Sequence, residues 1–219
     1  MSLPTYLELV NDVLVRMREP EVSSVSENTL SKLVGKLVND SKRQVEDAFS
    51  WNATLTTITV PTVAGTSQYT VTGSGNRFKV NEIHNTTKLL GLTNVPVKVY
   101  NTWEGSATTP PTGAPSYYCF FGQDSNGDAK VKVWPVPDAV YSIDYQLYVP
   151  SAPLASNSDT LNIPKEPVVL GAYARALVER GEDGGLNSSE AYGLYRASLA
   201  DHIAIESSRY FEDMNWEAT

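Results

Sequence analysis

The chain has 219 residues, of which 41% are hydrophobic and 19% charged, and its 17 basic and 25 acidic residues give a net charge of −8. This length suits one large domain or two small ones with a sizeable hydrophobic core. The acidic balance argues against a nucleic-acid binder of high affinity and against a protein held on anionic lipid by basic clusters.

The sequence also argues against membrane, secreted and zinc-binding classes. No apolar run approaches the ~18–20 residues that span a bilayer. Glu8 and Asp12 interrupt the apolar stretch that a signal peptide would need. Cys119 is the single cysteine, so neither an intrachain disulfide nor a cysteine-based zinc site can form. We therefore expect a soluble protein made in a cytoplasm, without a membrane anchor and without a cofactor.

The first 50 residues carry a helical pattern of apolar side chains and predict helices over 4–18 and 25–50. Pro4 suits the first turn of the first helix. Ser24 and Glu27 have the spacing of a capping box in front of the second. Gly35 inside the second helix costs about 1 kcal/mol relative to alanine. It therefore indicates a close helix crossing or a mild bend.

From Trp51 to about residue 163 the pattern changes to short segments rich in β-branched and aromatic residues, which predict strands. Asn126-Gly127 is a strong hairpin signal between two of these strands. The stretch 102–115 contains three prolines and predicts a long loop. The expected strands are 55–60, 67–71, 78–83, 95–100, 117–121, 130–134 and 141–149.

Helical periodicity returns after Pro164. Pro167 suits a first turn, Gly181 suits a helix C-cap, and Asn187 with Glu190 is expected to cap the last helix. The order of elements predicts an α+β fold, in which the N- and C-terminal helices form a helical bundle with an inserted antiparallel β-sandwich-like domain. The expected parts are a helical domain over 1–50 and 164–208, a β-rich domain over 51–163, and a tail over 209–219.

One pattern in the β-rich region resembles the start of a calcium loop, Asp124-x-Asn126-x-Asp128. Ala129 stands where such a loop needs glycine, and Pro135 stands where it needs glutamate. The chemistry of a hairpin turn explains the same residues, so no metal is predicted.

No other motif indicates an active site. Gly73-Ser74-Gly75 lies between strands rather than at the start of a helix, so it predicts a turn and not a phosphate cradle. The two histidines, His84 and His202, are isolated, and no Gly-x-Ser-x-Gly elbow occurs. We therefore expect a protein that is not an enzyme.

The β-rich region leaves one alternative open, a module that binds or hydrolyses glycans. Its aromatic residues could stack on sugars, although core and cross-strand packing explains them better. Its acidic residues could supply a catalytic pair, although solvated turns and strand ends explain them better. The aromatic residues are Tyr117, Tyr118, Phe120, Phe121, Trp134, Tyr141, Tyr145 and Tyr148, and the acidic ones are Glu104, Asp124, Asp128, Asp138 and Asp144.

The C-terminal helical region resembles podovirus tail tubular protein A, the family of phage head-to-tail adaptors. The distinctive stretches are 172–185, 195–201 and 206–210. Segments 113–118 and 133–137 resemble the β region of that family, and 6–15 with the helix ending near Trp51 fit its N-terminal part. None of these stretches is a catalytic motif.

The resemblance implies a structural protein of the virion at the head-tail junction. Such adaptors form a twelve-fold ring between the portal protein and the tail nozzle protein, and genomic DNA passes through the lumen. Residues 166–219 hold four basic and ten acidic residues, a balance of −6. Facing the lumen, these acids would keep DNA mobile without tight binding. The plainer interpretation is a solvated helix face.

The segment after the last helix matches the part with which such adaptors reach into the portal. It places four large side chains within seven residues, and such side chains are typical of interface cores. We expect the tail to dock into the portal and to be poorly ordered in the free subunit. The alternative is a tail folded back on its own helices. The residues expected at the portal are Arg209, Tyr210, Phe211, Met214 and Trp216.

Overall fold

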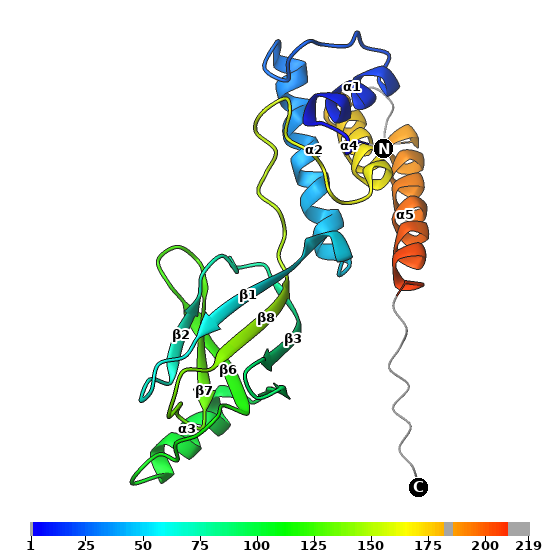
Figure 1. Cartoon of the computed structure of the whole chain (residues 1–219). Helices are drawn as coiled ribbons and strands as arrows, with labels where there is room; N and C mark the ends of the chain where they lie inside the picture. Colours follow the sequence, from blue (N-terminus) through cyan, green and yellow to red (C-terminus); the bar gives the residue numbers. More distant parts are fainter. Residues whose placement is uncertain (1, 182–185, 210–219) are drawn as a thin grey trace, which may run out of the picture. The chain divides into compact units, whose positions relative to one another are not determined.

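A computed structural model describes residues 2–181 and 186–209. The chain divides into two compact units, one built from residues 1–53 and 151–219 and the other from residues 54–150. The described residues form five α-helices and two largely antiparallel sheets, which confirms the predicted α+β class (Figure 1).

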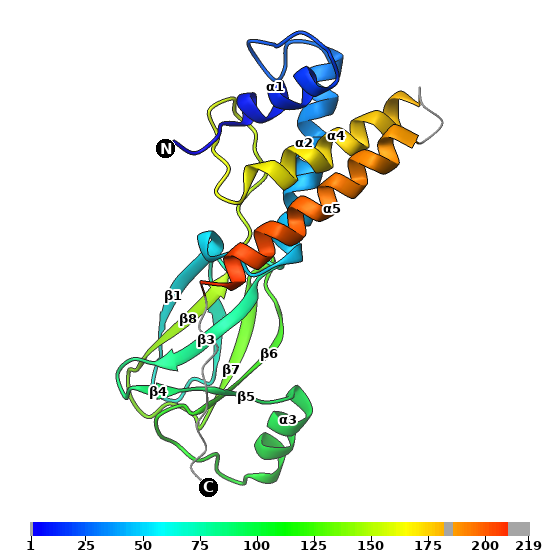
Figure 2. The same cartoon turned by 90° about the vertical axis from the view of Figure 1, so that its right-hand side faces the viewer.

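The first unit is helical, and α4 lies at its centre. α4 packs against each of the other three helices, and α5 runs beside it in Figures 1 and 2. The four share one hydrophobic core, which also receives Leu154, Leu161 and Ile163 from the segment that leads to α4. The helices are α1 (Tyr6–Arg16), α2 (Thr29–Ala48), α4 (Lys165–Arg180) and α5 (Leu186–Ser207).

The helix ends follow capping chemistry, although not always at the predicted residue. α2 begins at Thr29 and not at residue 25, because Asn28 and Ser31 form the capping box. The Asn28 Oδ1 accepts the Ser31 amide at 2.8 Å, and the Ser31 Oγ accepts the Asn28 amide at 3.1 Å. Glu27 instead accepts hydrogen bonds from Ser23, so the prediction of a Ser24–Glu27 box is wrong.

Of the two caps predicted for the C-terminal helices, one is confirmed and one is wrong. Gly181 ends α4 in the left-handed conformation at φ 64°, as predicted. Residue Leu186 is already helical, so Asn187 lies inside α5 and is not its cap.

Two glycines mark close helix crossings. A Cβ on Gly35 would lie 2.5 Å from the Tyr6 hydroxyl oxygen, so α1 approaches α2 where a side chain would not fit. This confirms the crossing predicted at Gly35. A Cβ on Gly171 of α4 would lie 2.3 Å from the Ser41 Oγ and 3.1 Å from the Tyr195 ring. α2, α4 and α5 therefore meet at Gly171.

The second unit contains two four-stranded sheets, in the orders β1-β8-β3-β4 and β2-β7-β6-β5 (Figure 2). Every pair is antiparallel except β5 with β6, which is parallel. The strands are β1 (Leu55–Pro61), β2 (Gln68–Val71), β3 (Lys79–Asn85), β4 (Leu90–Gly91), β5 (Thr93–Asn94), β6 (Tyr117–Gln123), β7 (Ala129–Trp134) and β8 (Ser142–Tyr148), preceded by the 3₁₀ turn η1 (Asn52–Thr54).

The two sheets contribute to one core through alternate residues of their strands. Ile143, Tyr145 and Leu147 of β8 are buried in it, together with Val131 and Val133 of β7. The β-branched and aromatic residues from which strands were predicted in this part of the sequence supply most of this core.

One predicted strand is wrong. Residues 97–106, expected as part of a strand and of a loop, form α3 (Val97–Ser106) directly after Pro96. The helix buries Tyr100 against the Trp134 ring at a centroid distance of 5.7 Å. The alternating valines of this segment suit a strand. Pro96 in front of the helix and the contact of Tyr100 with Trp134, which lies far away in the sequence, favour the helix instead.

Candidate interaction site

The predicted docking tail begins at Arg209, the last residue that the structure describes. Tyr210, Phe211, Met214 and Trp216 lie outside the described residues. The Arg209 Nη1 donates to the Glu206 Oε2 at 2.8 Å, so the first residue of the tail is paired with the last turn of α5.

Glu206 connects this end of α5 to a distant part of the chain. It is buried, and its Oε1 accepts the backbone amide of Asn52 at 2.9 Å. The neighbouring Trp51 is also buried, and its indole Nε1 donates to the Val45 carbonyl at 2.7 Å. The end of α5 is therefore fixed to the segment that follows α2.

A cavity of about 460 Å³ opens between these two segments. Ile205, Glu206 and Arg209 line it on one side, and Trp51 and Asn162 contribute to its remaining wall. Its walls combine apolar surface with the paired charges of Glu206 and Arg209.

His202 also lines this cavity and has a structural contact. Its ring Nδ1 lies 2.8 Å from the carbonyl oxygen of Ser198, one turn earlier in α5. This contact joins the His202 ring to the backbone of the preceding turn of α5.

In the β unit, the turn at residues 124–128 is hydrogen-bonded to the glycine turn at residues 73–75. The Asp124 Oδ1 accepts the amides of Asn126 and Asp128 at 2.8 and 2.9 Å, which is turn chemistry. The Asp128 Oδ1 accepts the amides of Gly73 and Gly75 at 3.0 and 2.9 Å. The amides that a phosphate would need thus already bind a carboxylate of the chain itself.

The other histidine lies in a row of polar residues across three strands. The His84 Nε2 is 3.9 Å from the Asp144 Oδ2, and the Asp144 Oδ1 accepts the Thr59 hydroxyl at 2.6 Å. The carboxylate lies between the histidine and the hydroxyl, so this row does not have the order in which a histidine activates a nucleophile. Among residues 2–181 and 186–209, no three His, Cys, Asp or Glu side chains are grouped to hold a metal ion.

The aromatic residues of the β unit are mostly packed inside it. Five of the eight that suggested a sugar-stacking face are buried, namely Tyr118, Trp134, Tyr141, Tyr145 and Tyr148. Tyr117 is exposed, and Trp103 of α3 packs on its ring edge at a centroid distance of 5.3 Å. The described part of the chain therefore presents no row of exposed aromatic rings for a glycan.

Sequence reasoning missed the roles of Glu206 and Asn52. Arg209 and Glu206 are three residues apart on a helix, which is a recognisable pairing distance. The bond between Glu206 and Asn52 joins residues 154 positions apart. No local pattern could have indicated it.

None of the helices in the described ranges is long and apolar enough to cross a membrane.

A family model, that of the SU10 adaptor protein, matches residues 4–215. No curated protein gives a significant match to the chain. The family match extends over both compact units and confirms the predicted resemblance to phage head-to-tail adaptors. The chain therefore belongs to the SU10 adaptor protein family, whose members are structural adaptor proteins of the phage virion.

Proposed function

We propose that this protein forms a ring between the portal protein and the tail nozzle protein and extends the conduit through which genomic DNA leaves the head. The observation that carries the proposal is the family match over residues 4–215. The match spans the helices, the β unit and the tail as far as residue 215. It therefore favours an adaptor over the glycan-acting alternative, whose aromatic face is largely buried.

The proposed architecture is a helical bundle that carries an inserted β-sandwich-like domain. The two compact units support it, because the chain enters the β unit after residue 53 and leaves it at residue 150. Helices from the N-terminal and C-terminal parts of the chain form the helical unit together. In a ring, each subunit contacts a neighbour on either side through heterologous interfaces, and this unit would supply both contact surfaces.

The free subunit is largely monomeric in this proposal and becomes a twelve-fold ring on the portal. A net charge of −8 opposes association of free subunits, and the portal supplies a template that binds only the assembled form. Sedimentation of the purified protein at micromolar concentration tests this part. A stable dodecamer without portal would contradict it.

Docking on the portal is assigned to the tail, with Tyr210, Phe211 and Trp216 as anchors. Aromatic and methionine side chains contribute most of the binding energy at interface cores. Arg209, the first residue of the tail, is paired with Glu206 in the last turn of α5.

A variant that ends at Ser208 tests the docking. It is expected to keep a near-native circular dichroism spectrum and to lose attachment to portal-bearing heads, as seen by negative-stain imaging. Asn215→Ala is the matched control, because it changes the tail without removing an anchor, and it is expected to form rings on portals. Attachment of the shortened chain at the level of the full chain would refute the assignment.

A further inference from the structure

The cavity at the C-terminal end of α5 lies wholly within the helical unit. The last two turns of α5 form one part of its wall, and residues 51–53 and 162–164 form the rest. Its volume of about 460 Å³ is far larger than the share of one water molecule in the liquid, about 30 Å³. The cavity therefore has room for a large side chain.

Apolar side chains from three segments line this cavity. Ile205 of α5 is 54% exposed there, although it belongs to the last two turns of a helix that packs on α4. Trp51, Ile163 and Pro164 supply further apolar surface. A group of apolar side chains around one opening, unlike a single exposed residue, marks a surface that takes up another chain segment.

Charge does not select the occupant of this cavity. Glu206 and Arg209 both line it, and they are paired with each other at 2.8 Å. Glu206 also accepts the Asn52 amide at 2.9 Å, so its carboxylate is bonded through both oxygens. A charged side chain therefore gains little at this wall, whereas an apolar side chain gains free energy by leaving water.

We propose that, in the free subunit, the tail turns back at Arg209 and places Trp216 in this cavity. The structure describes the chain as far as Arg209, which itself lines the cavity. The ten residues that follow, 210–219, carry four large apolar side chains. The apolar part of the tail thus begins at the wall of an apolar cavity of the same unit. This is the folded-back tail that the sequence left as an alternative.

The length of the tail fits this route. The cavity extends along α5 from His202 to Arg209, seven residues or about 10 Å of helix. A reversing turn takes four residues, Arg209 to Glu212. The four steps from Glu212 to Trp216 then span about 13 Å in extended chain. A tail that turns back beside α5 therefore brings Trp216 level with His202, at the far end of the cavity.

Trp216 is the large side chain that this route carries deepest into the cavity. Tyr210 and Phe211 belong to the turn itself, and Met214 follows the turn by only two steps. The two acidic residues after Phe211 also lie at the turn, where their carboxylates remain in water. A buried tryptophan removes about 150–250 Å² of surface from water, so the contact stabilises the folded-back tail.

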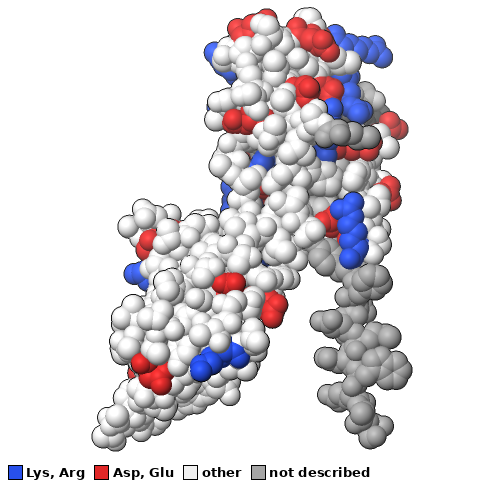
Figure 3. Space-filling view, in the orientation of Figure 1, with Lys and Arg blue, Asp and Glu red and all other residues white. Residues whose placement is uncertain are grey.

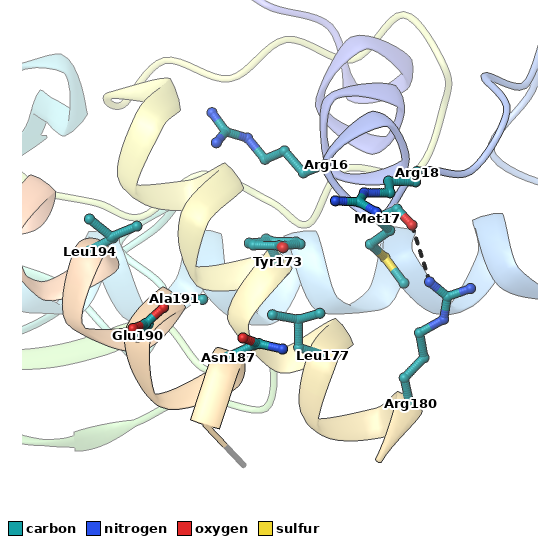
Figure 4. A pocket seen from close by; sticks show the side chains of 10 residues that line it. All are labelled: Arg16, Met17, Arg18, Tyr173, Leu177, Arg180, Asn187, Glu190, Ala191 and Leu194. Atoms are coloured by element: carbon teal, nitrogen blue, oxygen red, sulfur yellow. Dashed lines mark hydrogen bonds between the residues drawn. The ribbon is translucent and has the colours of Figure 1, made fainter. Parts of the chain in front are cut away.

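Figure 4 shows a second open groove, the groove at Arg18, between the C-terminal ends of α1 and α4 and the first turns of α5. The residues that line it include Arg16, Arg18, Tyr173, Glu190 and Leu194. Leu194 precedes His202 by eight residues, about 12 Å of helix. Because the returning tail brings Trp216 only as far as His202, Trp216 does not reach this groove.

The tail of the same chain is favoured over the tail of a neighbour by concentration. A segment tethered by a few residues reaches millimolar effective concentration, well above the micromolar concentration of a free second copy. The net charge of −8 also opposes the approach of a second copy. The inference rests on the proposed function only in using the same tail that is assigned to the portal, which would then compete with the cavity for Trp216.

Disulfide trapping in the full-length chain tests the contact. Ala53→Cys lies on the cavity wall and Asn215→Cys lies next to Trp216, while the native Cys119 is buried in the β unit. With oxidised glutathione and no portal, this double variant is expected to form an intramolecular disulfide rapidly. The matched control combines Asn215→Cys with Asn187→Cys, which is exposed in the first turn of α5, and is expected to react slowly.

Substitutions on both sides of the contact test what holds the tail. Added to the trapping pair, Ile205→Ser is expected to slow disulfide formation about fivefold, because part of the apolar wall is lost. Leu194→Ser is the matched control, a 61% exposed residue of α5 outside the cavity, and is expected to leave the rate unchanged. Trp216→Ala is expected to slow trapping about tenfold, because alanine lacks the ring that occupies the cavity.

Three results would overturn the inference. A covalent dimer would assign the cavity to a neighbour's tail, and trapping no faster than in the Asn187→Cys control would remove the contact. A rate unaffected by both Ile205→Ser and Trp216→Ala would remove the role of Trp216. Because no portal is present, each of these results leaves the proposed docking on the portal intact. A failure of portal docking would in turn leave the trapping rate unchanged.

Discussion

Lys42 and Glu46 form an ion pair of 2.8 Å inside the helical unit, and both side chains are almost completely buried. The Glu46 Oε1 also accepts the amide and the hydroxyl of Ser151, at 3.2 and 3.0 Å. The Lys42 Nζ donates to the Ser151 carbonyl at 2.9 Å. The pair therefore holds the start of the segment that leads to α4 against α2.

Glu46→Gln is expected to destabilise the helical unit by about 3–5 kcal/mol, because it leaves the Lys42 ammonium buried without a counter-charge. Urea unfolding followed by far-UV circular dichroism measures the loss. Asp12→Asn is the matched control, since it breaks the exposed pair with Lys165 and is expected to cost less than about 1 kcal/mol. Equal unfolding midpoints for the two variants would contradict the importance of the buried pair.

Gly171→Ala is expected to destabilise the protein by about 1–3 kcal/mol, although alanine favours helices by about 1 kcal/mol. The new Cβ would lie 2.3 Å from the Ser41 Oγ, inside a tightly packed crossing. Gly193→Ala on α5 is the control and is expected to stabilise, because no atom of the described residues lies within 4 Å of a Cβ placed there. Thermal melts measure both effects.

A second substitution identifies the clash in Gly171→Ala. Adding Ser41→Ala removes the Oγ and is expected to restore part of the lost stability, leaving only the approach to the Tyr195 ring at 3.1 Å. If the double variant were less stable by the sum of two independent losses, the contact with Ser41 would not be the cause.

Tyr145 is expected to make the β unit sensitive to alkaline pH. Burial raises the pKa of its hydroxyl far above the ordinary value, and the nearby Tyr69 and Tyr118 add to the shift. The unfolded chain ionises near pH 10, whereas the folded chain keeps the phenol neutral. The contribution of Tyr145 to the free energy of unfolding is thus complete below about pH 10. It decreases as the pH rises toward the pKa of Tyr145 in the folded chain.

Tyr145→Phe is therefore expected to shift alkaline unfolding to higher pH. At pH 7 it is expected to leave stability unchanged or raised by about 1 kcal/mol, since this buried hydroxyl has no hydrogen-bond partner in the described part of the chain. Tyr148→Phe, which removes a hydroxyl that donates to Asn81 at 3.2 Å, serves as control. Unfolding of both variants at the same alkaline pH would contradict the role of Tyr145.

The purified protein is expected to bind duplex DNA weakly. Residues 166–219 carry a charge of −6, and on the face shown in Figure 3 the basic side chains are interspersed with acidic ones. Tight binding would need a continuous basic surface that releases counterions. Fluorescence anisotropy with a labelled duplex at several salt concentrations measures this, and tight binding with a steep salt dependence would contradict it.

The sequence by itself determined the order of the helical, β-rich and helical parts of the chain and several of the turns within them. The Asn126-Gly127 hairpin, the Gly181 cap and the close approach at Gly35 were all predicted from local residues. Each depends on backbone conformations or spacings within a few residues, which the residue types record directly.

Only the tertiary structure decided the features that depend on distant partners. α3 replaced a predicted strand because Tyr100 packs on Trp134, and the Asp128 carboxylate accepts the amides of the glycine loop at 73–75. The bond from Glu206 to Asn52 and the groove at Arg18 bring together segments more than 150 residues apart. Such contacts depend on how several elements pack together, and a single stretch of sequence carries no periodicity that specifies them.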